Sequence, residues 1–167
     1  MSKEKKLILD KSQILQIVRR MAYQVYEQNH TANQIFLVGI DSNGLKISEL
    51  IKKELEQISD IPVQLIKVEM DKAARSQPHV NLSTLPDKEH LHIVVVDDVL
   101  NSGRTMIYAL DPFLQLNIEK LQTAVLVNRS HKRFPIAVDY KGLELATTIE
   151  EHIEVQLTED DYSAFLY

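Results

Sequence analysis

Residues 93–105 read IVVVDDVLNSGRT, and this stretch decides the fold. Its apolar start, Ile93–Val96, is typical of a parallel strand that is buried on both faces. We expect the strand to end at Asp97 and Asp98, followed by a small-residue turn and a helix from Thr105 onward. Such a turn gathers backbone N–H groups and the positive end of a helix dipole, and both attract anions.

Two carboxylates beside an anion site limit the ligands that suit it. Asp97 and Asp98 would repel a bare phosphate, but they favour a ligand that also carries hydroxyl groups or a metal ion. A sugar phosphate has these features. Strands of α/β proteins also often end in Asp without any ligand nearby. Without the rest of the motif, the acidic pair could therefore have a purely structural role.

Length and composition narrow the class of protein. The chain has 167 residues, a formal net charge of −5 and no cysteine. This length predicts a single domain over residues 1–167 with a sizeable core, and the lack of cysteine excludes disulfides and thiol chemistry. The N-terminus is too poor in apolar residues for a signal peptide, and no apolar run reaches the roughly 18 residues of a membrane span. We therefore expect a cytoplasmic protein that does not contact membranes.

Predicted strands and helices alternate along the chain. Asp10 and Gln13 have the spacing of a capping box, and they start a helix that ends near residues 29–30. Pro112 should kink its helix or delay the start. The later predictions are strand 35–39, turn 41–44, helix 45–58, strand 63–70, loop 71–90, helix 105–116, strand 121–128 and two short strands over 137–140 and 152–157.

This alternation predicts an α/β fold with a doubly wound, mostly parallel sheet flanked by helices. In such sheets, ligands bind at the carboxyl ends of the strands. Residues 39–44, 97–105 and 128–133 all follow predicted strands. We therefore expect these three polar segments to form one site at one edge of the sheet.

The stretch 93–105 resembles the phosphoribosyl-pyrophosphate (PRPP) motif of the type I phosphoribosyltransferases. That motif is a hydrophobic strand, an acidic pair, two apolar residues and a small-residue loop that ends in Thr or Ser. Residues 126–143 and the tail HIEVQL (152–157) are similar to the branch of bifunctional pyrimidine regulators and uracil phosphoribosyltransferases, known as PyrR. The resemblance implies the type I phosphoribosyltransferase fold, in which terminal segments form a small hood.

The resemblance also implies a reaction and a set of site residues. PRPP would transfer its phosphoribosyl group to a nucleobase, most plausibly uracil, with Mg²⁺ as cofactor and pyrophosphate as leaving group. Asp97 and Asp98 would be catalytic, would face the ribose and would hold the metal indirectly through substrate, and Arg75 would close over the leaving group. The 5′-phosphate would bind to Asn101, Ser102, Gly103, Arg104 and Thr105. The pyrophosphate would bind to Asp41, Ser42, Asn43 and Gly44. The base would bind to Asn128, Arg129, Ile153 and Glu154.

Three residues differ from the patterns of the family. Asn101 stands where the 6-oxopurine enzymes have a carboxylate and the pyrimidine branch has Tyr, Asn43 replaces an Arg, and Tyr23 replaces a His. The alternatives are a hypoxanthine/guanine enzyme, a nucleotide-sensing regulator that binds RNA through Lys and Arg side chains on the first helix and around Lys132 and Arg133, or a PRPP-binding domain without catalysis. The resemblance further implies a homodimer or a higher homo-oligomer.

Overall fold

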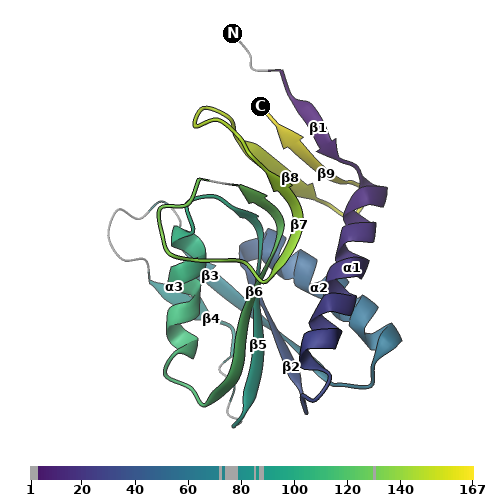
Figure 1. The fold of residues 1–167 in the computed structure, drawn as a ribbon, viewed down its shortest axis with the longest axis vertical. Coiled ribbons are helices and arrows are strands. Elements are labelled where there is room, and N and C mark those ends of the chain that lie inside the picture. Colours follow the sequence, from purple (N-terminus) through teal and green to yellow (C-terminus); the bar gives the residue numbers. More distant parts are fainter. Residues whose placement is uncertain (1–3, 72, 74–78, 85, 87–88, 130) are drawn as a thin grey trace.

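The computed structural model describes residues 4–71, 73, 79–84, 86, 89–129 and 131–167. Its main element is a six-stranded sheet with the strand order β4-β3-β2-β5-β6-β7 (Figure 1). Neighbouring strands are parallel, except that β4 is antiparallel to β3. The strands are β2 (Ile35–Ile40), β3 (Val63–Met70), β4 (Val80–Leu82), β5 (Leu91–Leu100), β6 (Ile118–Arg129) and β7 (Tyr140–Leu145).

Helices cover both faces of this sheet. Helices α1 (Lys11–Asn29) and α2 (Asp41–Ile58) pack on one face, and α3 (Arg104–Leu110) with the short 3-10 helix η1 (Asp111–Phe113) packs on the other (Figure 1). This arrangement confirms the predicted α/β fold with a doubly wound, mostly parallel sheet. Within the described chain, no helix is both long enough and apolar enough to cross a membrane.

The apolar run of β5 divides between two core layers. Val94 and Val96 lie in the layer beneath α1 and α2, while Ile93 and Val95 lie in the layer beneath α3. All four side chains are fully buried. Since successive side chains of a strand point to opposite faces, a strand covered on both faces needs apolar residues at every position.

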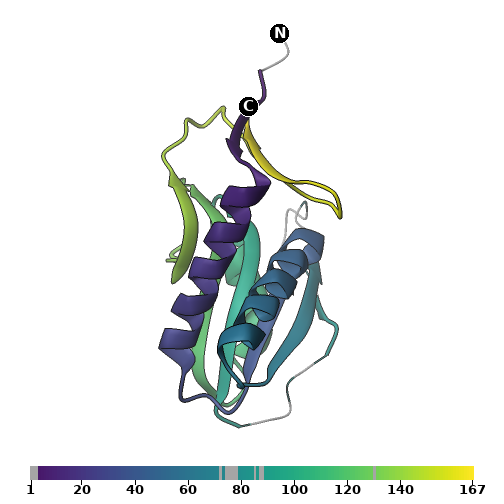
Figure 2. The ribbon, with the colours of Figure 1, turned by 90° about the vertical axis from the view of Figure 1, so that its right-hand side faces the viewer.

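The two ends of the chain form a second sheet, which we call the hood. It has the order β1-β9-β8 and comprises β1 (Lys6–Leu9), β8 (Ile153–Leu157) and β9 (Tyr162–Leu166), all antiparallel. Figures 1 and 2 show the hood beyond the carboxyl ends of the parallel strands, with β1 and β9 side by side. The hood expected from the family resemblance is thus confirmed.

Several predicted boundaries were wrong. β5 does not end at the acidic pair, because Val99 and Leu100 continue the parallel ladder with β6. Residues 41–44 are the first turn of α2 and not a separate turn before it. α3 begins at Arg104 and is neither delayed nor kinked by Pro112, because Pro112 lies beyond its end in η1, where a missing N–H is tolerated.

The weak predictions near the chain end had mixed outcomes. The strand predicted over 137–140 is wrong, since β7 starts only at its last residue, whereas the strand predicted over 152–157 is confirmed as β8 within one residue. β6 starts three residues before its predicted start at Leu121, at Ile118. β1, β4 and β9 were missed, and β4 lies inside the predicted loop 71–90.

The capping box predicted at the start of α1 is confirmed. The Gln13 N–H donates to Asp10 at 2.8 Å, and the Asp10 N–H donates to Gln13 at 2.9 Å.

A buried polar network closes the amino end of the sheet, at the end of α1. At its last residue, Asn29 accepts a hydrogen bond from His92 Nδ1 at 2.9 Å and donates to Gln122 Oε1 at 3.0 Å. Burial is the main cause that lowers the pKa of His92.

This network predicts a loss of stability in mild acid. Because the folded state lowers the pKa of His92 below its ordinary 6.5, the unfolded chain binds a proton at pH values where the folded protein does not. The contribution of His92 to stability is therefore complete above pH 6.5 and is lost as the pH falls from 6.5 through the lowered pKa. Urea unfolding between about pH 5 and pH 7 measures this decline.

His92→Asn keeps a donor for Asn29 but removes the titrating ring, so its free energy of unfolding should decline less in acid. His30→Asn changes an exposed histidine directly after α1 and is the matched control, and the decline in acid should be smaller in His92→Asn than in this control. Equal pH dependences for the two variants would contradict the prediction.

Candidate active site

The acidic pair lies inside the ladder of β5, near its carboxyl end. Asp97 is only 3% exposed, and Asp98 is half-buried. The backbone N–H of Asp98 donates to Asp97 Oδ1 at 2.9 Å, and the backbone N–H of Val99 donates to Asp98 Oδ1 at 2.8 Å. Backbone hydrogen bonds thus hold both carboxylates in place, which is the kind of preorganisation that electrostatic catalysis requires.

The start of α2 brings a second predicted segment, residues 41–44, against the acidic pair. A Cβ atom on Gly44 would lie 2.5 Å from the carbonyl oxygen of Val96, so only glycine allows this close approach. Asp41 has a φ of 53°, which is a costly conformation for a residue other than glycine. The amide of Asn43 then donates a hydrogen bond to Asp98 Oδ2 at 2.8 Å.

The predicted phosphate loop, residues 101–105, is held by the segment that follows β6. Ser102 accepts hydrogen bonds at its carbonyl from the N–H groups of Arg133 at 2.8 Å and Phe134 at 3.0 Å. Gly103 has a φ of 85°, and a Cβ atom there would lie 2.5 Å from the Ile136 side chain. The loop conformation therefore depends on glycine at this position.

Arg129 is a buried brace beside this loop, with 7% exposure. Its guanidinium donates to Asn101 Oδ1 at 2.9 Å and to Thr147 Oγ1 at 2.8 Å. The same group donates to the carbonyls of Thr148 at 3.1 Å and Glu151 at 2.8 Å. Arg129 thus orients Asn101 and fixes the segment that leads to the hood, a role that no local sequence pattern indicates.

A pocket of about 380 Å³ lies between the phosphate loop and the end of β6. It is lined by Asn101, Ser102, Arg129, His131, Lys132, Arg133 and Ile149. The predicted segments 97–105 and 128–133 therefore meet, and the basic turn that follows β6 belongs to the pocket wall. Thr147 and Ile149 were missed, because they come from an irregular segment without a recognisable motif.

Asn128 has an unsatisfied acceptor at the edge of this region. The residue is 2% exposed, and its Nδ2 donates to Glu144 Oε1 at 3.3 Å. Among the residues that the structure describes, its Oδ1 is buried without a hydrogen-bond partner. An unpaired buried acceptor costs about 1–3 kcal/mol, and Asn128 does not line the pocket, although it directly precedes Arg129, which does.

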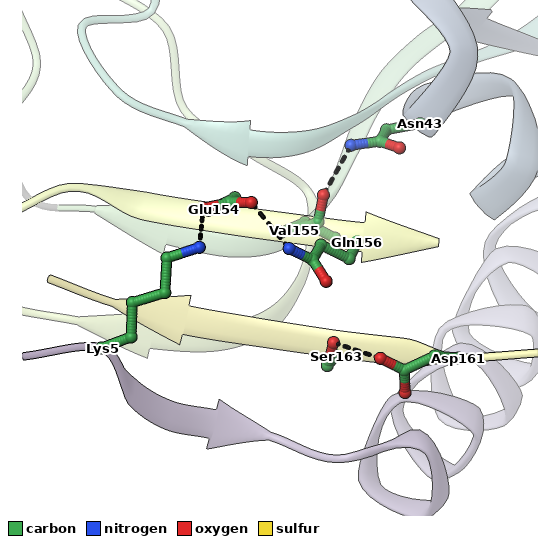
Figure 3. A network of polar contacts seen from close by, with 7 residues as sticks. All are labelled: Lys5, Asn43, Glu154, Val155, Gln156, Asp161 and Ser163. Carbon is green, nitrogen blue, oxygen red and sulfur yellow. Dashed lines mark hydrogen bonds and ion pairs between the residues drawn. The ribbon is translucent and has the colours of Figure 1, made fainter. Parts of the chain in front are cut away.

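The predicted base-binding residues of the hood have other contacts as well. Ile153 is half-buried against the core, and Glu154 forms an ion pair with Lys5 at 2.7 Å (Figure 3). Hydrogen bonds from Lys5 and Gln156 lower the pKa of Glu154. The hood also reaches the acidic pair, because Asn43 donates to the carbonyl of Val155 at 3.0 Å. Arg75 lies outside the described residues.

The described residues include no cluster of three or more His, Asp or Glu side chains that could hold a metal ion. The adjacent carboxylates of Asp97 and Asp98 still fit Mg²⁺, since this ion binds one or two carboxylates and takes its other ligands from substrate phosphates and water.

Comparisons with known proteins agree with this geometry. Residues 5–160 match the family model of the phosphoribosyl transferase domain. The "Bifunctional protein PyrR" of Latilactobacillus sakei is 32% identical over 166 residues, and that of Fusobacterium nucleatum is 34% identical over 164 residues; each match covers 93% of both chains. The hypoxanthine phosphoribosyltransferase of Trypanosoma cruzi has a TM-score of 0.73 at 17% identity, covering 84% of this chain and 81% of that one, which shows a shared fold.

The brace function of Arg129 predicts a large loss of stability on substitution. Arg129→Met removes a nearly buried guanidinium that donates to four partly or fully exposed acceptors, which water can then reach, so the free energy of unfolding should fall by about 1–3 kcal/mol. Arg19→Met, which removes an exposed ion pair with Glu54, should cost less than about 1 kcal/mol. If urea unfolding gives the same loss of free energy for Arg129→Met and Arg19→Met, Arg129 does not brace the site.

Proposed function

Since the chain belongs to the type I phosphoribosyltransferase family, as do the proteins named PyrR that match most of its length, we propose that it transfers the 5-phosphoribosyl group of PRPP to uracil. The observation that carries this proposal is the preorganised acidic pair beside the loop 101–105. The pair supplies negative charge, and the loop adjoins a pocket with basic walls.

The reaction is a displacement at the anomeric carbon of PRPP. The base nitrogen forms the new C–N bond, the C–O bond to pyrophosphate breaks, and the proton of the attacking nitrogen passes to water. The transition state resembles an oxocarbenium ion, as in glycoside chemistry. The carboxylates of Asp97 and Asp98 stabilise the positive charge that develops on the sugar, because they are fixed in place before the reaction.

Each segment of the site has a proposed role. The loop 101–105 binds the 5′-phosphate, and residues 41–44 lie beside the pyrophosphate. Arg75 closes over the leaving group. Family members use Mg²⁺ with PRPP, and here Asp97 and Asp98 would hold it through substrate oxygens and water. When bound, Mg²⁺ offsets the negative charge of the departing pyrophosphate.

One side chain, Asn101, favours uracil over a 6-oxopurine. Asn128, a proposed base-binding residue, does not discriminate, because its Oδ1 could accept the N3–H of uracil or the N1–H of hypoxanthine equally well. The Oδ1 of Asn101 accepts a hydrogen bond from Arg129, and an amide cannot exchange a proton with purine N7 as a carboxylate can. The curated relatives bear the name of the pyrimidine branch, which further supports this choice.

Other properties stay predictions, some from length and composition and some from the resemblance. They are one domain over residues 1–167, a cytoplasmic location, a homodimer or higher homo-oligomer, and base-binding roles for Arg129, Ile153 and Glu154. RNA binding through the exposed Lys132 and Arg133 also stays a prediction, and the net charge of −5 disfavours it.

The proposed reaction predicts a selective, metal-dependent transfer. With PRPP and Mg²⁺, radiolabelled uracil should yield labelled UMP, and a metal chelator should abolish the product. Hypoxanthine, guanine and xanthine serve as competing bases and should yield little product. The absence of product from every base would disprove the transferase, whereas a purine nucleotide as the main product would disprove only the choice of base.

Substitution in the acidic pair should separate catalysis from stability. Asp98→Asn keeps the shape of the side chain but removes its charge, so we expect kcat to fall about 100-fold or more with little change in the free energy of unfolding. Asp60→Asn, at an exposed position beyond α2, should leave both values unchanged. A large loss of stability with unchanged kcat would indicate that the acidic pair serves only the fold.

A further inference from the structure

The two halves of the proposed site lie on two different sheets. The ribose half, with Asp98, belongs to β5 of the main sheet, and part of the base half, Ile153 and Glu154, belongs to β8 of the hood. Transfer requires the base nitrogen within about 3–3.5 Å of the anomeric carbon, and a misplacement of about 1 Å can cost 100-fold in rate. The position of the hood relative to β5 therefore bears directly on the reaction.

One side chain forms hydrogen bonds to both sheets. The Nδ2 atom of Asn43 carries two hydrogens, and it donates to Asp98 Oδ2 at 2.8 Å and to the carbonyl of Val155 at 3.0 Å. Figure 3 shows Asn43 above β8, with its amide directed at the Val155 carbonyl. Only an amide or a cation can donate to two such oxygens from one nitrogen, and the amide does so without adding charge.

Asn43 and the Val155 strand to which it bonds both lie in closely packed parts of the structure. Asn43 is in the first turn of α2, next to the close contact between Gly44 and Val96. Val155 is 7% exposed and pairs with Ala164 of β9. Because β8 is an edge strand of the hood, its outward carbonyls have no partner strand, and Asn43 supplies a donor for one of them.

We propose that Asn43 is a positioning residue, which sets the distance between the bound base and the ribose by tying Asp98 to β8. This inference rests on the proposed transfer reaction. Asn43 itself holds no reacting atom. Its amide keeps Asp98 in the orientation that receives the ribose, and keeps β8 at a fixed distance from the same carboxylate.

The bridge predicts a selective kinetic defect in Asn43→Ala. The value of kcat/KM for uracil should fall about 100-fold, since the base half is no longer held against the ribose half. The Kd of PRPP with Mg²⁺, measured by calorimetry, should change less than about tenfold, because Asp98 loses one hydrogen bond but keeps its charge. Asn43→Asp should have a lower kcat/KM and a higher Kd of PRPP than Asn43→Ala, because it places a second carboxylate beside Asp98.

Hydrogen exchange of β8 supplies a readout that is independent of activity. Amides of residues 152–158 should exchange faster in Asn43→Ala than in the wild type. Ser163→Ala is the matched control, because it removes a hydrogen bond to Asp161 inside the hood and leaves the bridge intact (Figure 3). Its kcat/KM and its exchange in β8 should stay at wild-type values. If Asn43→Ala does not fold, Asn43→Ser replaces it, since a serine hydroxyl has one hydrogen and cannot donate to both partners.

The outcomes separate this inference from the proposed function. A wild-type protein that yields no product with any base disproves the transferase, and the exchange of β8 then decides alone whether Asn43 ties the hood to β5. If the wild type is active, unchanged kcat/KM and unchanged exchange in Asn43→Ala overturn the inference. An equal loss of PRPP binding and of base transfer also overturns it, because Asn43 would then act only as part of the PRPP site.

Discussion

The rest of the structure depends on the pairing of β5 between β2 and β6. This strand is apolar toward both helical layers and parallel to both neighbours, so its direction fixes which edge of the sheet carries the polar groups. The ladder with β6 continues past the acidic pair to Leu100, and Asp97 and Asp98 are therefore held by the sheet and not by a loop. A nearly buried carboxylate such as Asp97 needs a hydrogen bond in place of water, and the backbone N–H of Asp98 donates it; the half-buried Asp98 accepts from the N–H of Val99 and from Asn43.

The charges around this edge are unevenly distributed. The acidic pair lies next to the start of α2, whereas Arg129, His131, Lys132 and Arg133 surround the pocket on the side of the phosphate loop. A ligand with hydroxyl groups at one end and a phosphate at the other matches this division. Arg129 connects the loop 101–105 to the hood, since it fixes Asn101 on one side and the segment leading to β8 on the other.

The sequence predicted well the features that depend on neighbouring residues. The capping box of Asp10, the two-sided burial of Ile93–Val96 and the polar segments at the strand ends all follow from short-range spacing. Features that depend on distant partners could not be predicted in this way. β1 and β9 exist because they pair with each other, the extension of β5 to Leu100 requires β6, and the roles of Asn43 and Arg129 arise from contacts between separate elements.

The pairing of β1 with β9 has a consequence for biosynthesis. Lys6 is opposite Leu166 in the hood, so this contact spans nearly the whole chain, and such distant contacts form late in folding. A nascent chain on the ribosome can complete β5, the acidic pair and the phosphate loop long before residues 162–166 are synthesised. Until then β8 lacks its neighbour in the hood, and the growing polypeptide has the proposed sugar-phosphate half of its site without the proposed base half.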